Sequence, residues 1–180
     1  MPSKVLVPLA DGFEDIEAFT IIDVLRRGGV EVVPVGVTGM RVTSKYGMRV
    51  MLERRLMDVN PEEFDAVVLP GGSVGVANLS KSARLRKILR DFAAKGKLIG
   101  AICAAPLLLA SEGILDDKRA TVYPGLERRI PYPRDAKVVV DGNVVTSQGP
   151  GTAMEFALKL VEILRGKSVA SRVRRELVVP

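Results

Sequence analysis

Residues 97–113 read KLIGAICAAPLLLASEG, and this stretch decides the fold. Its first six residues form an apolar run typical of a buried strand, and the last nine, APLLLASEG, have the pattern of a helix that ends at a glycine. The only cysteine of the chain, Cys103, lies between the two. A buried strand that passes directly into a helix indicates an α/β protein whose parallel sheet is covered by helices.

The same alternation of strands and helices runs along the whole chain. We therefore predict one domain, residues 1–180, with a three-layer α/β/α sandwich of the flavodoxin-like (class I glutamine amidotransferase-like) type and a mostly parallel sheet. Residues 38–60 are ambiguous and contain either a hairpin or a bulged extension. Strands are predicted at 4–10, 30–37, 64–72, 97–102 and 119–123, and a hairpin at 137–148. Helices are predicted at 14–29, 80–96, 105–113 and 151–167. The N-cap of the second helix is Ser80 or Ser82, and the fourth helix closes the chain and is stopped by Gly166.

Composition excludes several classes of function. A chain with one cysteine and no histidine cannot close an internal disulfide and offers no ordinary transition-metal site, so we expect a reducing compartment and no metal or cofactor. The net charge is +6, but basic residues are interspersed with acids and aromatic residues are scarce, which favours a solvated surface over nucleic-acid binding. The sequence shows neither a membrane-spanning apolar run nor a signal-peptide pattern, which predicts a cytoplasmic protein without a membrane partner.

Four features that carry chemistry follow predicted strands. They are ADGFEDIE (10–17), PGGSVG (70–75), Cys103 and Tyr123. In open parallel sheets, ligands bind beyond the carboxyl ends of the strands, near the point where the strand order switches. The predicted topology therefore gathers a carboxylate, a glycine turn, a thiol and a phenol in one region.

Cys103 stands at the elbow between its strand and the helix that contains Pro106 in its first turn. The free amide groups of a helix N-terminus stabilise an anion, so this position predicts a lowered thiol pKa and a strained backbone. The alternative is a buried, inert cysteine, which is a common fate of free cysteine.

Gly71 and Gly72 end a predicted buried strand, where glycine lets a backbone amide face a bound oxygen, as in an oxyanion hole. An ordinary turn between strand and helix explains them equally well. The segment is not a phosphate-binding P-loop, because its GK[ST] ending is missing.

Glu14, Asp15 and Glu17 lie at the start of the first predicted helix. Acids there can simply stabilise the helix dipole. Helical spacing, however, places Glu17 on the apolar stripe that continues through Ile21, Val24, Leu25 and Gly28. Glu17 is therefore the acid expected to face inward, with a raised pKa that suits it to donate a hydrogen bond or to move protons.

The motifs ADGFEDIEA, DAVVLPGG, AICAAP and TSQGPGTAMEFAL resemble those of the ThiJ/PfpI superfamily, and are closest to its DJ-one (Parkinson-disease protein deglycase) branch. The similar spacing runs from Lys4 to about Val179. The resemblance implies a flavodoxin-like sandwich, a homodimer and a reactive cysteine at Cys103. It also implies that Glu17 is the hydrogen-bonding glutamate of that cysteine, and that the amides of Gly72 and Ala104 bind an oxyanion.

The chain departs from the superfamily pattern at three positions. Ala104 stands where the protease-like branch has a histidine, which argues against peptidase activity. Tyr123 stands where the DJ-one branch often has a histidine, and Tyr46 where some relatives have an arginine. The cysteine–glutamate pair is intact, and Tyr123 and Gly71 are expected to orient the substrate.

Three functions follow from the resemblance and the residues. The first is a cofactor-independent enzyme of the glyoxalase III or deglycase type, in which Cys103 and Glu17 act on a small aldehyde, a dicarbonyl or a glycated protein, with a stress-protective role. The second is a redox-sensing stress protein or chaperone whose Cys103 is oxidised without turnover. The third and weakest is an intracellular cysteine peptidase.

Overall fold

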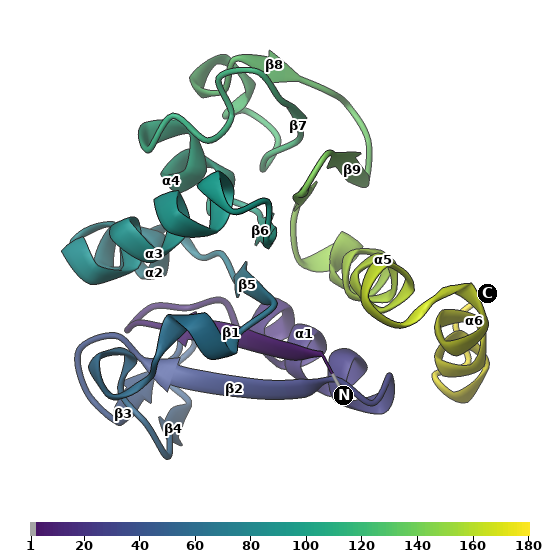
Figure 1. Ribbon diagram of the computed structural model, residues 1–180, viewed down its shortest axis with the longest axis horizontal. Coiled ribbons are helices and arrows are strands. Elements are labelled where there is room, and N and C mark those ends of the chain that lie inside the picture. The colour runs from purple at the N-terminus through teal and green to yellow at the C-terminus, as the bar shows by residue number, and fades with distance from the viewer. Residues whose placement is uncertain (1–2) are drawn as a thin grey trace.

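The computed structural model describes residues 3–180, and at its centre lies a six-stranded sheet with helices on both faces (Figure 1). The strand order is β2-β1-β5-β6-β10-β9. Neighbouring strands pair in parallel, except in the late hairpin β9–β10. The predicted flavodoxin-like arrangement and its hairpin are therefore confirmed. The strands are β1 (Lys4–Leu9), β2 (Glu31–Gly36), β5 (Ala66–Leu69), β6 (Leu98–Ile102), β9 (Val138–Asp141) and β10 (Val144–Ser147).

Two hydrophobic clusters, one on each face of the sheet, form the core. The helices α1 (Asp15–Arg27), α5 (Ala153–Arg165) and α6 (Lys167–Glu176) supply one cluster. The helices α2 (Ser73–Ser80), α3 (Ala83–Ala94) and α4 (Pro106–Ser111) supply the other. Because both faces are covered, the central strands are apolar on both sides, which explains their continuous apolar runs in the sequence.

Two helices were not predicted. Helix α2 has the sequence SVGVANLS, whose small and polar residues give little helical periodicity. Helix α6 follows Gly166, which ends α5 as predicted; the chain turns there with a φ of 94° and begins a new helix at once. The prediction that α5 closes the chain was therefore wrong. Ser82, rather than Ser80, is the N-cap of α3 and accepts a hydrogen bond from the Leu85 N–H group.

Three segments outside the central sheet complete the fold. The ambiguous region 38–60 contains a hairpin of β3 (Arg41–Thr43) and β4 (Arg49–Met51), followed by short 3₁₀ helices. The strand predicted at 119–123 is shorter in the structure, where only Arg119–Ala120 form a strand, β7. Strand β7 pairs with β8 (Tyr132–Pro133) in a separate small sheet. The 3₁₀ helices are Leu56–Asp58, Pro61–Glu63, Glu127–Arg129 and Pro150–Thr152.

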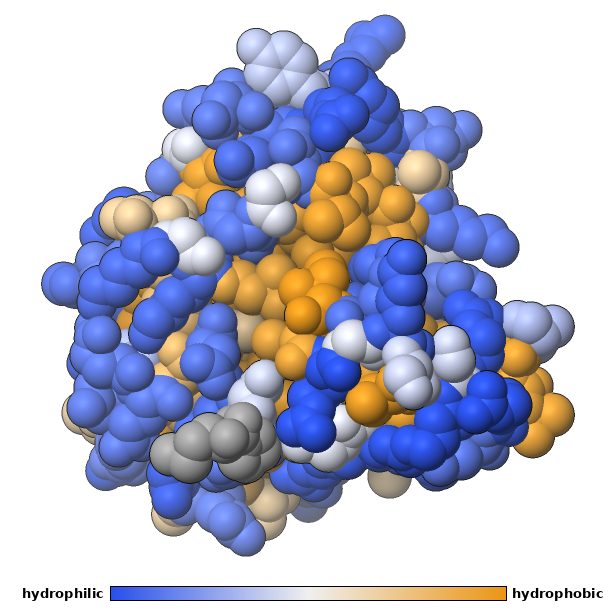
Figure 2. Space-filling model, turned by 45° about the vertical axis from the view of Figure 1, so that its right-hand side comes forward, coloured by the Kyte–Doolittle hydropathy of each residue, from blue (hydrophilic) through white to orange (hydrophobic). Residues whose placement is uncertain are grey.

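The surface is largely hydrophilic. The face in Figure 2 is covered mainly by hydrophilic residues, with a hydrophobic area in its middle. Several basic side chains pair with acids one helical turn away, and each exposed pair contributes only about 0.3–0.5 kcal/mol. No helix within residues 3–180 combines the length and the apolar character that crossing a bilayer requires. The ion pairs between residues one helical turn apart join Arg27 to Asp23, Lys87 to Asp91, and Arg172 to Glu176.

Candidate active site

The switch in strand order lies between β1 and β5, since the chain passes from β1 to β2 on one side and reaches β5 on the other. The loops after β1, β5 and β6 meet at this edge of the sheet. The first loop leads into the helix turn that holds Glu17, and the other two carry the glycine pair and Cys103. Three adjacent strands, β1, β5 and β6, therefore bring these features close together, as predicted.

Glu17 lies in the first turn of α1 and is fully buried. Its N–H group donates to a side-chain oxygen of Glu14, the N-cap residue, at 2.8 Å. Ile21, Val24 and Leu25 are buried on the same face of α1. The inward stripe predicted from helical spacing is thus confirmed, and it directs the Glu17 carboxyl group toward the sheet.

The two oxygens of the Glu17 carboxyl group have different surroundings. Oε1 accepts a hydrogen bond from the Gly71 N–H group at 2.9 Å. Oε2 is buried and has no well-aligned hydrogen-bond partner within residues 3–180, although the carboxyl group interacts with the Cys103 thiol. Burial, and then the charge of Glu14, raise the pKa of Glu17 to about 7. This is the predicted direction, and it suits proton transfer near neutral pH.

Cys103 has a φ of 67°, and the only other non-glycine residue between 3 and 180 with a positive φ is Val178. Hydrogen bonds on both sides hold this conformation: its N–H group donates to Ser147 O at 3.0 Å, and its carbonyl accepts from the Tyr123 N–H group at 2.9 Å. The strained elbow predicted at the end of β6 is confirmed.

The thiol of Cys103 receives hydrogen bonds from the N–H groups of Gly72 and Ala104, which favour the thiolate. Burial and the negative charge of Glu17 outweigh them and raise the pKa of Cys103 to about 11. The predicted lowering was therefore wrong. The helix expected to lower it, α4, has six residues and begins only at Pro106, so its dipole offsets little of the cost of burial.

Glycine is required at both positions of the turn after β5. A Cβ atom on Gly71 would lie 2.5 Å from Cys103 Cβ and 2.6 Å from Glu17 Oε1. Gly72 has a φ of 92°, and its Cβ atom would lie 2.4 Å from the Gly12 carbonyl oxygen. The Gly71 N–H group is used by Glu17, so Gly71 orients Glu17, whereas we had expected it to orient the substrate.

A pocket of about 370 Å³ opens above the thiol. It brings together the sequence-predicted residues Cys103, Gly72, Ala104 and Tyr123, while Glu17 lies behind them in the protein interior. The Tyr123 side chain is 47% exposed. Glu14, Lys45, Tyr46, Ser73, Leu126 and Pro150 complete the lining.

The tip of the β3–β4 hairpin forms one wall of this pocket. The resemblance pointed to Tyr46 as a position near the site, but the role of Lys45 and the contacts that hold the tip were not predicted. Asp15 holds the tip in place, because its carboxylate accepts hydrogen bonds from Ser44 Oγ at 2.5 Å and from the Tyr46 N–H group at 3.3 Å. The Lys45 N–H group donates to Phe13 O at 2.8 Å. Asp15 was interpreted only as a helix-dipole acid, and nothing local in the sequence links it to a residue 29 positions away.

Residues 3–180 contain no group of three or more histidine, cysteine, aspartate or glutamate side chains placed to hold a metal ion. The chemistry assembled at the pocket consists of a thiol, a carboxyl group of raised pKa and two backbone N–H donors. Such a set can add a nucleophile to a carbonyl carbon, hold the resulting oxyanion and move a proton.

Comparison with known proteins gives one consistent result. Protein dj-1beta of Drosophila melanogaster is 40% identical over 184 residues, covering 99% of this chain and 98% of that protein. The glutathione-independent glyoxalase DJR-1.2 of Caenorhabditis elegans is 36% identical over 176 residues, covering 96% and 94%. The structure of oxidized Toxoplasma gondii DJ-1 superimposes with a TM-score of 0.95, at 39% identity and 98% coverage of both chains. Because the model of the DJ-1/PfpI family also matches residues 3–163, this chain belongs to the DJ-1/PfpI family.

Proposed function

We propose that this protein is a cofactor-independent enzyme of the glyoxalase III or deglycase type, in which Cys103 acts on reactive dicarbonyls or their protein adducts in a stress-protective role in the cytoplasm. The carrying observation is the pair formed by Glu17 and Cys103 at the base of the pocket, with the Gly72 and Ala104 N–H groups directed at the sulfur. The name of the C. elegans relative, a glutathione-independent glyoxalase, supports the same chemistry.

The first step joins the sulfur to the aldehyde carbon of a 2-oxoaldehyde. As the Sγ–C bond of Cys103 forms, Glu17 takes up the thiol proton. The thiol can therefore react without losing its proton to solvent hydroxide, although its pKa is raised. The negative charge moves to the former aldehyde oxygen, where the N–H groups of Gly72 and Ala104 stabilise it. Protonation of that oxygen by Glu17 gives a hemithioacetal.

The second step is an internal redox exchange. The Glu17 carboxylate removes the proton from the hemithioacetal carbon and, through an enediol, returns a proton to the neighbouring carbon. The first carbon is thereby oxidised to a thioester and the second reduced to an alcohol, so no external oxidant is needed. Water then attacks the thioester, the S–C bond breaks, and a 2-hydroxy acid leaves as Cys103 regains its proton.

The test is incubation of the pure protein with methylglyoxal, with the product followed by NMR. We expect many equivalents of lactate per protein chain from the wild type and none from Cys103→Ser, which keeps the size of the side chain. Val178 is the other non-glycine residue between 3 and 180 with a positive φ, and the exposed surface variant Val178→Ala is a control expected to retain activity. Stoichiometric modification of Cys103 without lactate would contradict the proposal.

That contradictory outcome is the one expected of the second candidate, a redox-sensing protein. The observation in its favour is the half-buried, unpaired thiol beside a buried carboxyl oxygen without a well-aligned partner. Oxidation of the thiol to a sulfinic acid adds oxygens that a protonated Glu17 can donate to. Mass spectrometry after peroxide treatment detects such an acid as two added oxygen atoms.

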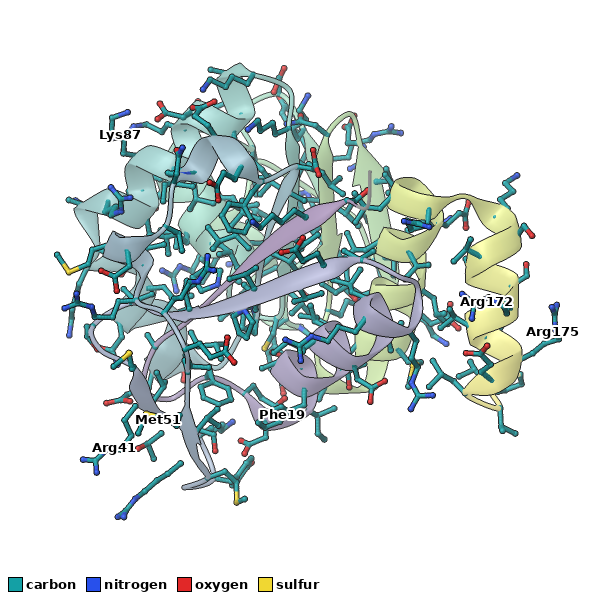
Figure 3. The ribbon with its side chains drawn as sticks, turned by 60° about the horizontal axis from the view of Figure 1, so that its bottom comes forward. Phe19, Arg41, Met51, Lys87, Arg172 and Arg175 are labelled. Atoms are coloured by element: carbon teal, nitrogen blue, oxygen red, sulfur yellow. The ribbon has the colours of Figure 1, made fainter. Side chains whose placement is uncertain are left out.

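We also propose that the protein is a homodimer. A largely apolar groove of about 360 Å³ runs between α1, the edge strand β2 and β4. Phe19 of α1 and Met51 of β4 line it and point to the same side of the molecule (Figure 3). Their side chains are 43% and 70% exposed, and exposed apolar surface of this kind favours association. Sedimentation equilibrium should give twice the chain mass at micromolar concentration; a monomer mass contradicts this proposal.

A further inference from the structure

The charge at the mouth of the Cys103 pocket is positive. Lys45 is exposed and has no ion-pair partner within residues 3–180. Its ammonium group lies 5.5 Å from the centre of the Tyr46 ring, a contact that leaves the charge in place. Of the two charged residues in the pocket lining, Lys45 is therefore the one available to a ligand.

The other charged lining residue, Glu14, does not compensate Lys45. Its side chain is only 5% exposed, and its carboxylate accepts the hydrogen bond from the Glu17 N–H group. The phenols of Tyr46 and Tyr123, both well exposed, add two further hydrogen-bond donors to the lining. The accessible part of the pocket is thus rich in donors and has no exposed carboxylate.

The position of Lys45 is fixed by the backbone around it. Its N–H group is bonded to Phe13 O, and the residues on either side, Ser44 and Tyr46, are bonded to Asp15. The charge of Lys45 also reaches the reacting pair, since it acts to lower the pKa of Glu17. A cation held on a fixed hairpin tip beside a nucleophile can recognise an anionic group on the molecule that the nucleophile attacks.

We infer that Lys45 makes the Cys103 pocket selective for aldehydes and dicarbonyls that carry an anionic group, a carboxylate or a phosphate, over neutral ones. This inference rests on the proposed role of Cys103 as the nucleophile. Lys45 acts as a specificity residue that binds the distant anionic end of the substrate, while Cys103 and Glu17 carry out the chemistry.

Iodoacetate and iodoacetamide test this directly, because they differ only in a carboxylate against a neutral amide. Each forms an Sγ–C bond to Cys103 and releases iodide, and the chain has no other cysteine to confuse the measurement. The readout is the iodoacetate-to-iodoacetamide ratio of alkylation rates, followed by mass spectrometry. Lys45→Met should lower this ratio by about three- to tenfold, and high salt should lower it in the wild type.

Two variants control the measurement. Lys45→Arg keeps the charge and should keep most of the wild-type ratio. Lys87→Met removes an equal charge from the exposed face of α3 (Figure 3) and should leave the ratio unchanged. If Lys45→Met leaves the ratio at the wild-type value, or if Lys87→Met lowers it equally, the inference is overturned.

A substrate series separates this inference from the proposed function. We compare kcat/KM for methylglyoxal, for 4,5-dioxopentanoate, which adds a carboxylate, and for hydroxypyruvaldehyde phosphate. Lys45→Met should lower the values for the charged substrates relative to methylglyoxal, and the more affected one identifies the preferred anion. If no substrate turns over but the alkylation ratio still depends on Lys45, the proposed function fails and anion recognition stands. If the substrates turn over but the alkylation ratio does not depend on Lys45, the proposed function stands and anion recognition by Lys45 fails.

Discussion

Glu17 Oε1 accepts a 2.9 Å hydrogen bond from the Gly71 N–H group, which leaves only Oε2 to face reacting atoms. Glutamine at position 17 can keep the first contact, because its amide oxygen also accepts from Gly71. It cannot take up the thiol proton. We therefore expect Glu17→Gln to fold and to lose about 10²- to 10⁴-fold in lactate formation from methylglyoxal. Full activity in a variant with a native circular dichroism spectrum would assign the proton to another group, and Glu14 is the next carboxylate to test.

The pH dependence of Cys103 alkylation follows from the same pair. With the pKa of Glu17 at about 7 and that of Cys103 at about 11, the pair loses its first proton near neutral pH. The resulting single charge is shared between carboxylate and thiolate, because the proton can move between them. Iodoacetamide alkylation should therefore show a first, smaller rise near pH 7 and its main rise toward the raised pKa of Cys103, above the value of about 8.5 for a free thiol.

Glu17→Gln is the control for that profile. Without the carboxyl group, the neutral inflection should disappear and the remaining midpoint should lie above that of a free thiol, because burial of Cys103 persists. A wild-type profile without an inflection between pH 6 and 8 would show that Glu17 does not share its proton with the sulfur.

Stability should depend on pH through Glu17. Its pKa is raised from 4.5 to about 7, so the folded state binds the proton more tightly than the unfolded state does. The stability that this proton confers is present below about pH 4.5 and is lost as the pH rises through about 7. Ionisation of Glu17 should cost the folded protein about 3 kcal/mol at pH 8.

Urea unfolding at pH 5 and pH 8 measures this cost. Glu17→Gln should gain stability relative to the wild type as the pH rises, whereas the exposed variant Asp117→Asn should show no such trend. A constant difference between Glu17→Gln and the wild type across this range would mean that Glu17 ionises at its ordinary pKa.

Gly71→Ala should damage both the fold and the site. The added Cβ atom would lie 2.5 Å from Cys103 Cβ and 2.8 Å from Ile102 O, so the turn after β5 must move away from β6. We expect about 1–3 kcal/mol of destabilisation and the loss of the hydrogen bond that orients Glu17. Gly151→Ala is the matched control, because a Cβ atom there meets nothing within 4 Å. Equal unfolding midpoints for the two variants would contradict this account.

Local patterns were enough to identify the centre of the site. Cys103 was found because an apolar strand passes into a helix at that residue, and Glu17 because it interrupts an otherwise apolar helical stripe. The glycine pair was found because it ends a buried strand. Each of these signals is contained within one strand or one helix and its flanking residues, where side-chain periodicity is set by backbone geometry.

The parts that were missed depend on distant contacts. The position of Lys45 in the pocket follows from hydrogen bonds that join the hairpin tip to Asp15 and Phe13. The direction of the Cys103 pKa was missed because it depends on how far the thiol is buried and on the charge of a carboxylate 86 positions earlier in the chain. Neither burial nor the distance between such residues is expressed in the local sequence.

Tyr123 is the remaining side chain of the predicted site, and its role is testable because the chain has no histidine. Its phenol lines the pocket and is half exposed, while its N–H group holds the Cys103 carbonyl. A phenol donates a hydrogen bond but seldom takes up a proton near neutral pH. Tyr123 should therefore orient the substrate or a water molecule, and the neutral limb of the pH–rate profile should come from Glu17 and Cys103.

Tyr123→Phe removes the hydroxyl group and keeps the ring and the backbone contact. We expect about a two- to tenfold loss in kcat/KM, the cost of one neutral hydrogen bond, with an unchanged shape of the pH profile. An unchanged rate would mean that the ring only packs against the Gly149 backbone. Loss of one limb of the profile would instead make Tyr123 an acid–base residue and contradict the assignment to Glu17.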